Sequence, residues 1–188
     1  MGPMASLPSS KTITYDEWLR MPEVRDAIEE VVNGEIGIMP APKWNHSIIV
    51  ENIRDALVAD LDRQEVRVVA TTFGLIIRKR PLTSRIPDLA VFTKSSIVEQ
   101  DGYIHSAPQL VVEVLSPANS RIERAEKLDD HASLGVPEVW VVSPEARTVE
   151  VLLLEAGSFR RSQILADGLL QPRLFPHVHV DIARIWPD

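Results

Sequence analysis

Residues 109–117 of the chain read QLVVEVLSP, an apolar run with one carboxylate, Glu113, at its centre. Alternate residues of a strand point to opposite faces, so this pattern predicts a strand over residues 110–115 that is buried on both faces. An ionised carboxylate in such a strand is costly unless a partner compensates its charge. We therefore expect a metal ion or a basic side chain beside Glu113.

A second carboxylate, Asp88, opens the apolar run 88–92 directly after Pro87. Proline is confined to the first position or the edge of a strand, so we expect a strand to begin here. If the two strands pair, Asp88 and Glu113 lie roughly 5 Å apart, the spacing of neighbouring strands. Two carboxylates at that distance suit one hard divalent cation. Other interpretations are open, since Pro-Asp is also common in turns and a buried Glu can belong to a structural ion pair.

A helix is expected over residues 121–134, beyond the buried strand. Ser120 and Glu123 have the spacing of a capping box, and Gly135 is a favoured residue after the end of a helix. Lys127 lies in this helix and could return a positive charge to the carboxylate pair. It also stands four residues after Glu123, which is the spacing of a surface ion pair, so both interpretations stay open.

The remaining pattern predicts a mixed α/β order. Asn33-Gly34 is a strong hairpin signal, and apolar residues recur at helical spacing over residues 46–61. The expected elements are a short helix at 15–20, strands at 30–32 and 36–39, a helix at 46–61, strands at 66–77, 88–92 and 110–115, a polar loop at 93–108, the helix at 121–134, strands at 139–142, 148–154 and 159–164, and a short element at 180–185. This order favours an α/β (α+β) mixed sheet flanked by helices.

These residues together resemble the PD-(D/E)XK nuclease superfamily, in which an Asp, a Glu and a Lys serve metal-dependent cleavage of phosphodiester bonds. More closely, the chain is similar to the small bacterial proteins of the Uma-two endonuclease family. The resemblance covers about residues 14–186 and is carried by Glu30–Glu35, Met39–Pro42 with His46, Pro87-Asp88, Val112–Pro117, Glu126-Lys127 and Gly135–Trp140. It departs from the superfamily at Leu115, which stands where the motif lysine is expected. In the Uma-two family the lysine is thought to have moved to the next helix, which implies that Lys127 replaces it.

The resemblance implies a restriction-endonuclease-like core with extra β-hairpins, and an endonuclease that uses Mg²⁺ or Mn²⁺. Asp88, Glu113 and the carbonyl of Val114 would hold the ion, which would activate a water for attack on the phosphate. Lys127 would stabilise the charge that develops on the phosphate. The substrate would be nucleic acid, and the resemblance favours DNA, although no residue distinguishes DNA from RNA.

Two further residues enter the site through the resemblance. It implies that Glu30 is an additional acidic site residue and that His46 orients a water, a phosphate or Glu30. Without the resemblance, Glu30 and Glu35 are two exposed carboxylates at a turn, and His46 is equally a helix cap or a surface residue.

The net charge of the chain limits how this protein can bind nucleic acid. The net charge of −7 argues against broad electrostatic attraction, because non-specific affinity comes largely from neutralising phosphates. Local charge differs, and a basic rim around the site is predicted from Arg78-Lys79-Arg80, Arg85, Arg121, Arg124 and Lys127. Residues 78–80 are equally well explained as solvated charges at the end of a strand.

Length and composition predict a single domain. The chain has 188 residues, and its 45% apolar content is enough for one core over residues 11–188, with a leader at 1–10 outside the fold. The absence of cysteine excludes disulfides and cysteine nucleophiles. No signal peptide and no apolar run of about 20 residues is present, so we expect a cytoplasmic protein with no membrane contact. Exposed hairpins favour a homodimer.

Other function classes stay open. A noncatalytic nuclease-fold protein that binds nucleic acid or a protein partner fits the acidic charge and the displaced lysine. An unrelated hydrolase could use the carboxylate pair on another anionic substrate. His177-Val178-His179 has a spacing found in cupin-type metal sites, but only nine residues follow it to supply the acid and histidine that such sites also need.

Overall fold

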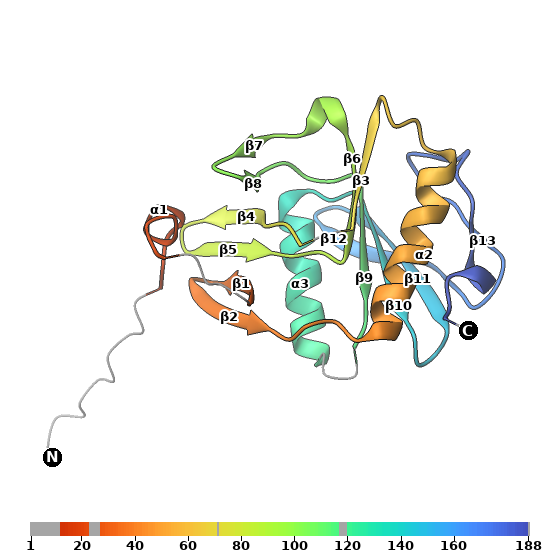
Figure 1. Cartoon of the computed structure of the whole chain (residues 1–188), viewed down its shortest axis with the longest axis horizontal. Coiled ribbons are helices and arrows are strands. Elements are labelled where there is room, and N and C mark those ends of the chain that lie inside the picture. Colours follow the sequence, from red (N-terminus) through yellow and green to blue (C-terminus); the bar gives the residue numbers. More distant parts are fainter. Residues whose placement is uncertain (1–11, 23–26, 71, 117–119, 188) are drawn as a thin grey trace, which may run out of the picture.

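The structure is a computed structural model that describes residues 12–22, 27–70, 72–116 and 120–187. Its strands form two six-stranded sheets and a two-stranded ribbon, with two long helices against them (Figure 1). The predicted leader at 1–10 and Pro117 lie outside the described residues. Within the described part, no helix is both long and apolar enough to cross a membrane.

The sheet that we call the core sheet has the order β12-β11-β10-β9-β6-β3. Its strands are β3 (Val66–Val69), β6 (Leu89–Thr93), β9 (Leu110–Val114), β10 (Glu138–Ser143), β11 (Thr148–Glu155) and β12 (Ser158–Leu165). β9 runs parallel to β10 and antiparallel to β6, so the sheet is mixed. All five residues of β9 are buried, which confirms the strand buried on both faces.

A helix covers each face of the core sheet. Helix α2 (Trp44–Asp60) buries Ile53 and Leu57 against a face that includes Val112. Helix α3 (Arg121–Leu134) packs Leu128 on the opposite face, against Val111. Because side chains alternate along a strand, Glu113 shares the α3 face with Val111.

The second sheet has the order β2-β1-β5-β4-β8-β7. Its strands are β1 (Ile28–Val32), β2 (Glu35–Met39), β4 (Leu75–Lys79), β5 (Leu82–Arg85), β7 (Glu99–Gln100) and β8 (Tyr103–Ile104). The predicted Asn33-Gly34 hairpin is confirmed: both turn residues have positive φ, 51° and 81°, as a type I′ turn requires. Helix α1 (Tyr15–Trp18), shorter than predicted, packs Tyr15 against this sheet.

The single strand predicted over residues 66–77 is wrong. β3 pairs with β6 in the core sheet, whereas β4 pairs with β5 in the second sheet, so the chain changes sheets between them. Gly74 marks the change, because a Cβ there would lie 2.7 Å from Cδ1 of Tyr103.

The loop predicted at 93–108 is also only partly right. It contains the short helix η1 (Lys94–Ser96) and the strands β7 and β8, and Tyr103 packs on the core of the second sheet. The strands β7 and β8 could not be predicted, because two polar or mixed residues are too few to give an alternating pattern in the sequence.

The rest of the predicted order is confirmed. β11 and β12 form the expected hairpin through Ala156-Gly157, and β10 is the expected buried strand. The chain ends with β13 (Leu169–Leu170), β14 (Val180–Asp181) and η2 (Ile182–Arg184). The fold class is the predicted mixed α/β arrangement with extra hairpins.

Candidate active site

The candidate site lies where the chain passes from β5 of the second sheet to β6 of the core sheet. Leu89 pairs with Val112 in the antiparallel β6–β9 register, which confirms that the strands of Asp88 and Glu113 are neighbours. Asp88 Oδ2 accepts a hydrogen bond from the backbone N–H of Val114, at 2.7 Å. The Asp88 side chain is 23% exposed, so solvent reaches it.

Glu113 is buried, with 8% of its surface exposed, and each of its oxygens has a partner. Oε2 lies 2.8 Å from the ammonium of Lys127. Oε1 lies 2.9 Å from Nε2 of His131, which must carry the proton because a carboxylate only accepts. A basic side chain therefore compensates the buried charge, as one of the two sequence-based expectations stated.

Lys127 enters the site from the second turn of α3. Its ammonium lies 3.6 Å from Glu30 Oε1 and donates to the carbonyl of Ile86 at 3.1 Å. Burial lowers the pKa of Lys127, but the carboxylates of Glu113, Glu30 and Asp88 outweigh burial and raise it above its usual range. The ammonium therefore stays charged.

The alternative surface pair of Lys127 with Glu123 is wrong. Glu123 instead completes the capping box of α3 by accepting the N–H of Ser120 at 2.7 Å. Lys127 extends instead to the buried side of the helix, where its ammonium contacts Glu113 and the Ile86 carbonyl.

Glu30 is a buried strand residue, 5% exposed, and not the exposed turn carboxylate of the alternative interpretation. Its Oε1 accepts the backbone N–H of Ile86 at 2.8 Å, and its Oε2 lies 3.2 Å from Nη1 of Arg85. Glu30 thus fixes the segment that leads into Asp88. Glu35, its companion across the turn, is exposed.

Arg85 is the second buried cation of the site. It is 6% exposed, and its Nε donates to Asp130 Oδ2 on α3 at 2.7 Å. Arg85 therefore ties β5 of the second sheet to the helix that carries Lys127. The prediction that Arg85 belongs to an exposed basic rim is wrong, because the residue is buried between two carboxylates.

Asp130 and His131 are site residues that the sequence-based analysis missed. They follow Lys127 by three and four positions in α3, and residues at that spacing share a helix face. That spacing is the signal that could have found them once Lys127 was placed in the site. Nδ1 of His131 is buried and has no hydrogen bond within the described residues.

His46 lies in the first turn of α2, with Nε2 3.3 Å from Asp88 Oδ2. It is not the helix cap, since the N-cap residue is Lys43. A hydrogen bond with Asp88 raises the pKa of His46 above its usual value; burial opposes the rise, while the Asp88 and Glu113 charges and the Val114 backbone add to it. His46 is thus held against the carboxylate pair.

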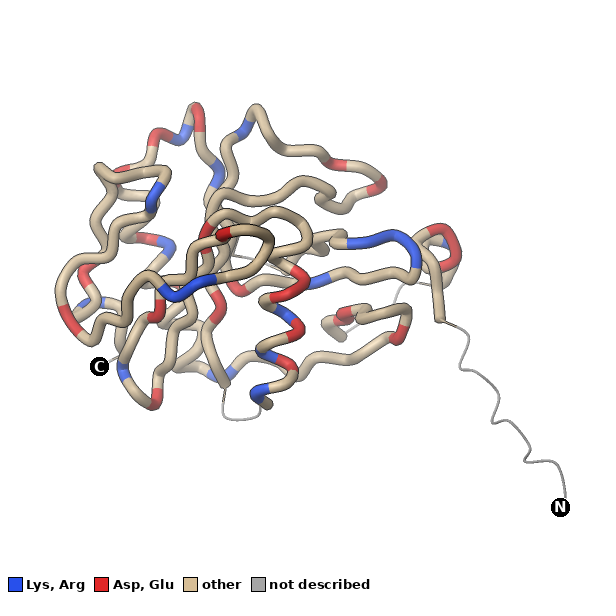
Figure 2. The backbone as a smooth tube through the Cα atoms, turned by 180° about the vertical axis from the view of Figure 1, so that it is seen from behind, with Lys and Arg blue, Asp and Glu red and all other residues tan. Residues whose placement is uncertain are grey.

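Most of the predicted basic rim does not surround the site. Residues 78–80 lie at the β4–β5 turn, near α1 (Figure 2). There Arg78 donates to Thr83, Lys79 to Gln100, and Arg80 pairs with Asp16. Elsewhere Arg124 pairs with Glu150 on β11.

Comparison with known proteins identifies the family. Residues 15–183 match the model of the Uma2 family, which is described as "Putative restriction endonuclease". The chain belongs to the Uma2 family. A solved structure described as a "putative nuclease belonging to DUF820" from Anabaena variabilis is similar to it, with 25% identity, a TM-score of 0.74, and coverage of 92% of this chain and 97% of that one. No curated protein matches the chain. The predicted Uma-two resemblance and nuclease-like fold are confirmed.

In this Uma2 protein, the position of the motif lysine is occupied by an apolar residue, Leu115. Leu115 packs in the cluster beneath α3, with Val111 and Val141. No charge enters the site from this position, and the ammonium beside Glu113 comes from Lys127 instead.

The donor types of the site fit a hard divalent cation. Its carboxylates outnumber its permanent cations by two: the former are Glu30, Asp88, Glu113 and Asp130, and the latter Arg85 and Lys127. Within the described residues, no group of three or more His, Asp or Glu side chains is arranged to hold a metal ion, and this includes His177 and His179. Mg²⁺ commonly binds through one or two carboxylates and keeps its waters, so a complete cage is not required.

Proposed function

We propose that this Uma2 protein is an endonuclease, dependent on Mg²⁺ or Mn²⁺, that hydrolyses phosphodiester bonds of DNA. The observation that carries the proposal is the position of Lys127, whose ammonium lies 2.8 Å from Glu113 although it comes from a helix and not from the strand motif. Together with Asp88, these residues supply the acid, acid and lysine of the superfamily. Family membership supports the nuclease reaction.

The proposed metal ligands are the carboxylates of Asp88 and Glu113 and the carbonyl of Val114. A bound Mg²⁺ supplies a Lewis acid for a phosphate oxygen and lowers the pKa of the attacking water. Each oxygen of Glu113 has one protein partner, so each keeps a further lone pair that it could offer to the ion. Lys127 then stabilises the charge that develops on the phosphate.

Glu30 and His46 support the site by holding its other residues in position. Glu30 holds the backbone of Ile86, two residues before Asp88, and keeps a negative charge beside Lys127. His46 holds Asp88 Oδ2 on its other side, next to the exposed part of that carboxylate. Both side chains limit the motion of the ligands and of the lysine.

The test is the nicking of supercoiled DNA by the purified protein in Mg²⁺, Mn²⁺ or excess EDTA. We expect cleavage with either ion and none in EDTA, and we expect Glu113→Gln to lower the rate by about 100-fold or more, because an oxygen ligand becomes a neutral amide. Glu138→Gln is the matched control, since Glu138 is also a buried glutamate, 2% exposed, but binds Trp140 and the Arg173 backbone. Equal cleavage by the Glu113 variant would remove the assignment.

One observation favours a second candidate, a noncatalytic nuclease-fold protein that binds nucleic acid or a protein partner. Both oxygens of Glu113 and one of Asp88 already have protein partners, so these carboxylates are hydrogen-bonded without an ion. Failure of the wild-type protein to nick DNA or RNA with either ion, combined with retained binding of an oligonucleotide, would favour this function.

The setting of the activity follows from the proposed substrate. Intracellular DNA is the proposed substrate, and a chain without cysteine needs no oxidising compartment. We therefore propose the cytoplasm as its location and one domain, residues 11–188, as its working unit. The homodimer stays a prediction.

A further inference from the structure

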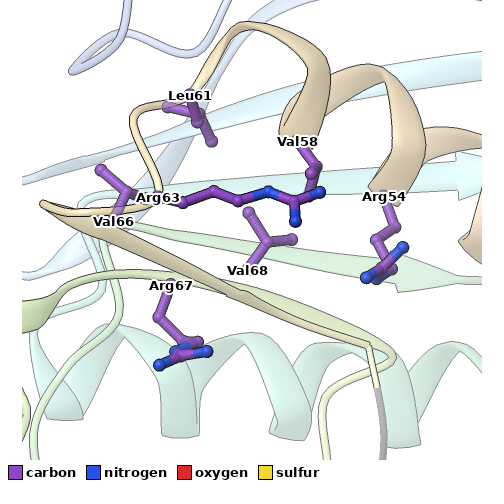
Figure 3. Close-up of a pocket in the computed structure, with 7 residues that line it drawn as sticks. All are labelled: Arg54, Val58, Leu61, Arg63, Val66, Arg67 and Val68. Atoms are coloured by element: carbon purple, nitrogen blue, oxygen red, sulfur yellow. The ribbon is translucent and has the colours of Figure 1, made fainter.

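A pocket of about 120 Å³ lies between the second half of α2 and the edge strand β3, away from the carboxylates of the site (Figure 3). Its lining includes three arginines, Arg54, Arg63 and Arg67, and the apolar residues Val58, Leu61, Val66 and Val68. Figure 3 shows the Arg63 side chain crossing the pocket above β3, while Arg67 extends on the other side of that strand. The positive charges therefore flank the free edge of the core sheet.

These arginines are available for a ligand. Arg63 and Arg67 are exposed and have no hydrogen bond or ion pair within the described residues. Arg54 pairs only with its neighbour Asp55, through side chains that are 44% and 73% exposed. An exposed pair of this kind contributes little to stability, so Arg54 can leave it for a ligand.

Among the described residues, the acidic residue that precedes Arg63 in the chain makes no ion pair with an arginine of the pocket. Asp62, next to Arg63, uses Oδ1 to accept the backbone N–H of Gln64 at 2.8 Å. It is therefore engaged with its own turn. By contrast, the arginines of the β4–β5 turn and Arg124 of α3 have protein partners.

The chemistry of the pocket fits a phosphate. The planar guanidinium group presents paired donors that match two oxygens of a phosphate. Arg54 and Arg63 can share one phosphate at the pocket, and Arg67, on the other side of β3, can bind a neighbouring phosphate of the same strand. The apolar lining of the pocket excludes water from one side of the guanidinium groups and so strengthens their attraction to a phosphate. In a chain with a net charge of −7, unpaired arginines around a concavity indicate a localised anion site.

The pocket lies at a useful distance from the candidate active site. Arg54 follows His46 by eight residues of α2, a rise of about 12 Å along the helix. Arg67 pairs with Phe92, four residues after Asp88 in β6, which is about 13 Å along the strand. A nucleic acid strand that rises about 3.4 Å per nucleotide covers this distance in about four nucleotides.

We propose that Arg54 and Arg63 at the pocket, together with Arg67 on the other side of β3, form a second phosphate-binding site along the edge of the core sheet, which binds the backbone of the nucleic acid about four nucleotides from the bond that is cut. The identity of the ligand rests on the proposed endonuclease function. The site explains how an acidic protein holds a polyanion: a few arginines at one edge of the core sheet supply contacts that the paired arginines of the β4–β5 turn and Arg124 do not.

The test is equilibrium binding of a fluorescent duplex oligonucleotide in EDTA, measured by anisotropy at a series of NaCl concentrations. We compare the wild type with Arg63→Gln/Arg67→Gln and with the matched control Arg20→Gln/Arg160→Gln. Arg160 is exposed on β12, the opposite edge of the core sheet, and Arg20 is exposed just beyond α1. Both double variants lose two positive charges, so a general charge effect lowers their affinity equally.

We expect the pocket variant to bind roughly tenfold more weakly or worse at low salt. Its slope of log K against log salt should also fall by about 0.9 for each phosphate that the variant no longer neutralises, while the control keeps the wild-type slope. Equal behaviour of the two variants, or no binding by the wild type, would overturn the proposal. A third result would also overturn the proposal: inorganic phosphate raises the melting temperature of the wild type but not of the pocket variant, while the salt slope of oligonucleotide binding is the same for both. That result would assign the pocket to a free anion.

The same proteins separate this proposal from the proposed function. Metal-dependent nicking with an unchanged salt slope in the pocket variant would remove the phosphate site and keep the endonuclease. A lowered slope in a protein that nicks nothing would remove the endonuclease and keep the site for a bound nucleic acid.

Discussion

Glu113 could be predicted from the sequence as a site residue, whereas its partners Lys127 and His131 were harder to predict. Glu113 could be predicted as a residue that needs a partner, because an acid inside an apolar strand is costly. Its partners could not be read from their own surroundings, since Lys127 and His131 lie in a helix rich in polar and charged residues. Only the family resemblance selected Lys127, and nothing selected His131.

At the residue scale, we predict that Lys127→Met lowers the nicking rate by about 10²–10³-fold, the usual effect of removing a group that stabilises charge in the transition state. Lys127→Arg keeps a positive charge and should retain part of the rate. The measurement is the rate of plasmid nicking at saturating Mg²⁺.

Lys79→Met is the matched control for Lys127. Lys79 also bonds a side chain, Gln100 at 3.1 Å, but lies in β4 of the second sheet. Circular dichroism verifies that each variant is folded. A Lys127→Met protein that is folded and nicks as fast as the control would show that the ammonium has no catalytic part.

At the scale of elements, predictions were best where local chemistry decides the structure. Both ends of α3 were predicted from the Ser120 and Glu123 capping box and from Gly135, and α3 begins and ends as expected. The division of residues 66–77 into β3 and β4 was missed, because both strands are apolar and the signal between them is one glycine that fits the ring of Tyr103. Which sheet a strand joins depends on distant partners that a local pattern does not contain.

Gly135 gives a prediction at this scale. Its φ of 89° lies in the left-handed region, where a side chain costs about 1–2 kcal/mol. We therefore expect Gly135→Ala to lower the free energy of unfolding by about 1 kcal/mol or more, as measured by urea denaturation.

Gly37→Ala is the matched control, since a Cβ at Gly37 would meet only the Glu30 carbonyl oxygen, at 3.9 Å. We expect a change well below that of the Gly135 variant. An equal loss in both variants would mean that the left-handed conformation is not the cause.

For the whole molecule, the site depends on the joining of two sheets. Arg85 of the second sheet contacts Glu30 on β1 and Asp130 on α3, and Lys127 bonds the Ile86 carbonyl between the sheets. The sequence predicted one mixed sheet with added hairpins and placed Arg85 on a rim. Arg85 is buried because of long-range strand pairing, such as that of β1 with β5. No local feature of the sequence predicts that pairing.

We predict that Arg85→Met lowers the free energy of unfolding by about 3–5 kcal/mol, because it leaves Asp130 without its cation and leaves the buried Glu30 with only the Lys127 ammonium, 3.6 Å away. Urea denaturation measures the effect. Arg80→Met is the control, since the Arg80–Asp16 pair is 75% and 56% exposed and should contribute at most about 1 kcal/mol. Similar losses in the two variants would contradict the buried role of Arg85.

The most direct test of the central claim, that Asp88 and Glu113 together hold a divalent ion, is a calorimetric titration of the metal-free protein with Mn²⁺. We predict that the wild type binds one ion and that the folded Asp88→Asn and Glu113→Gln variants each lose this binding, because each lacks one carboxylate ligand. Absence of binding by the wild type at millimolar Mn²⁺, or unchanged binding in both variants, would contradict the account.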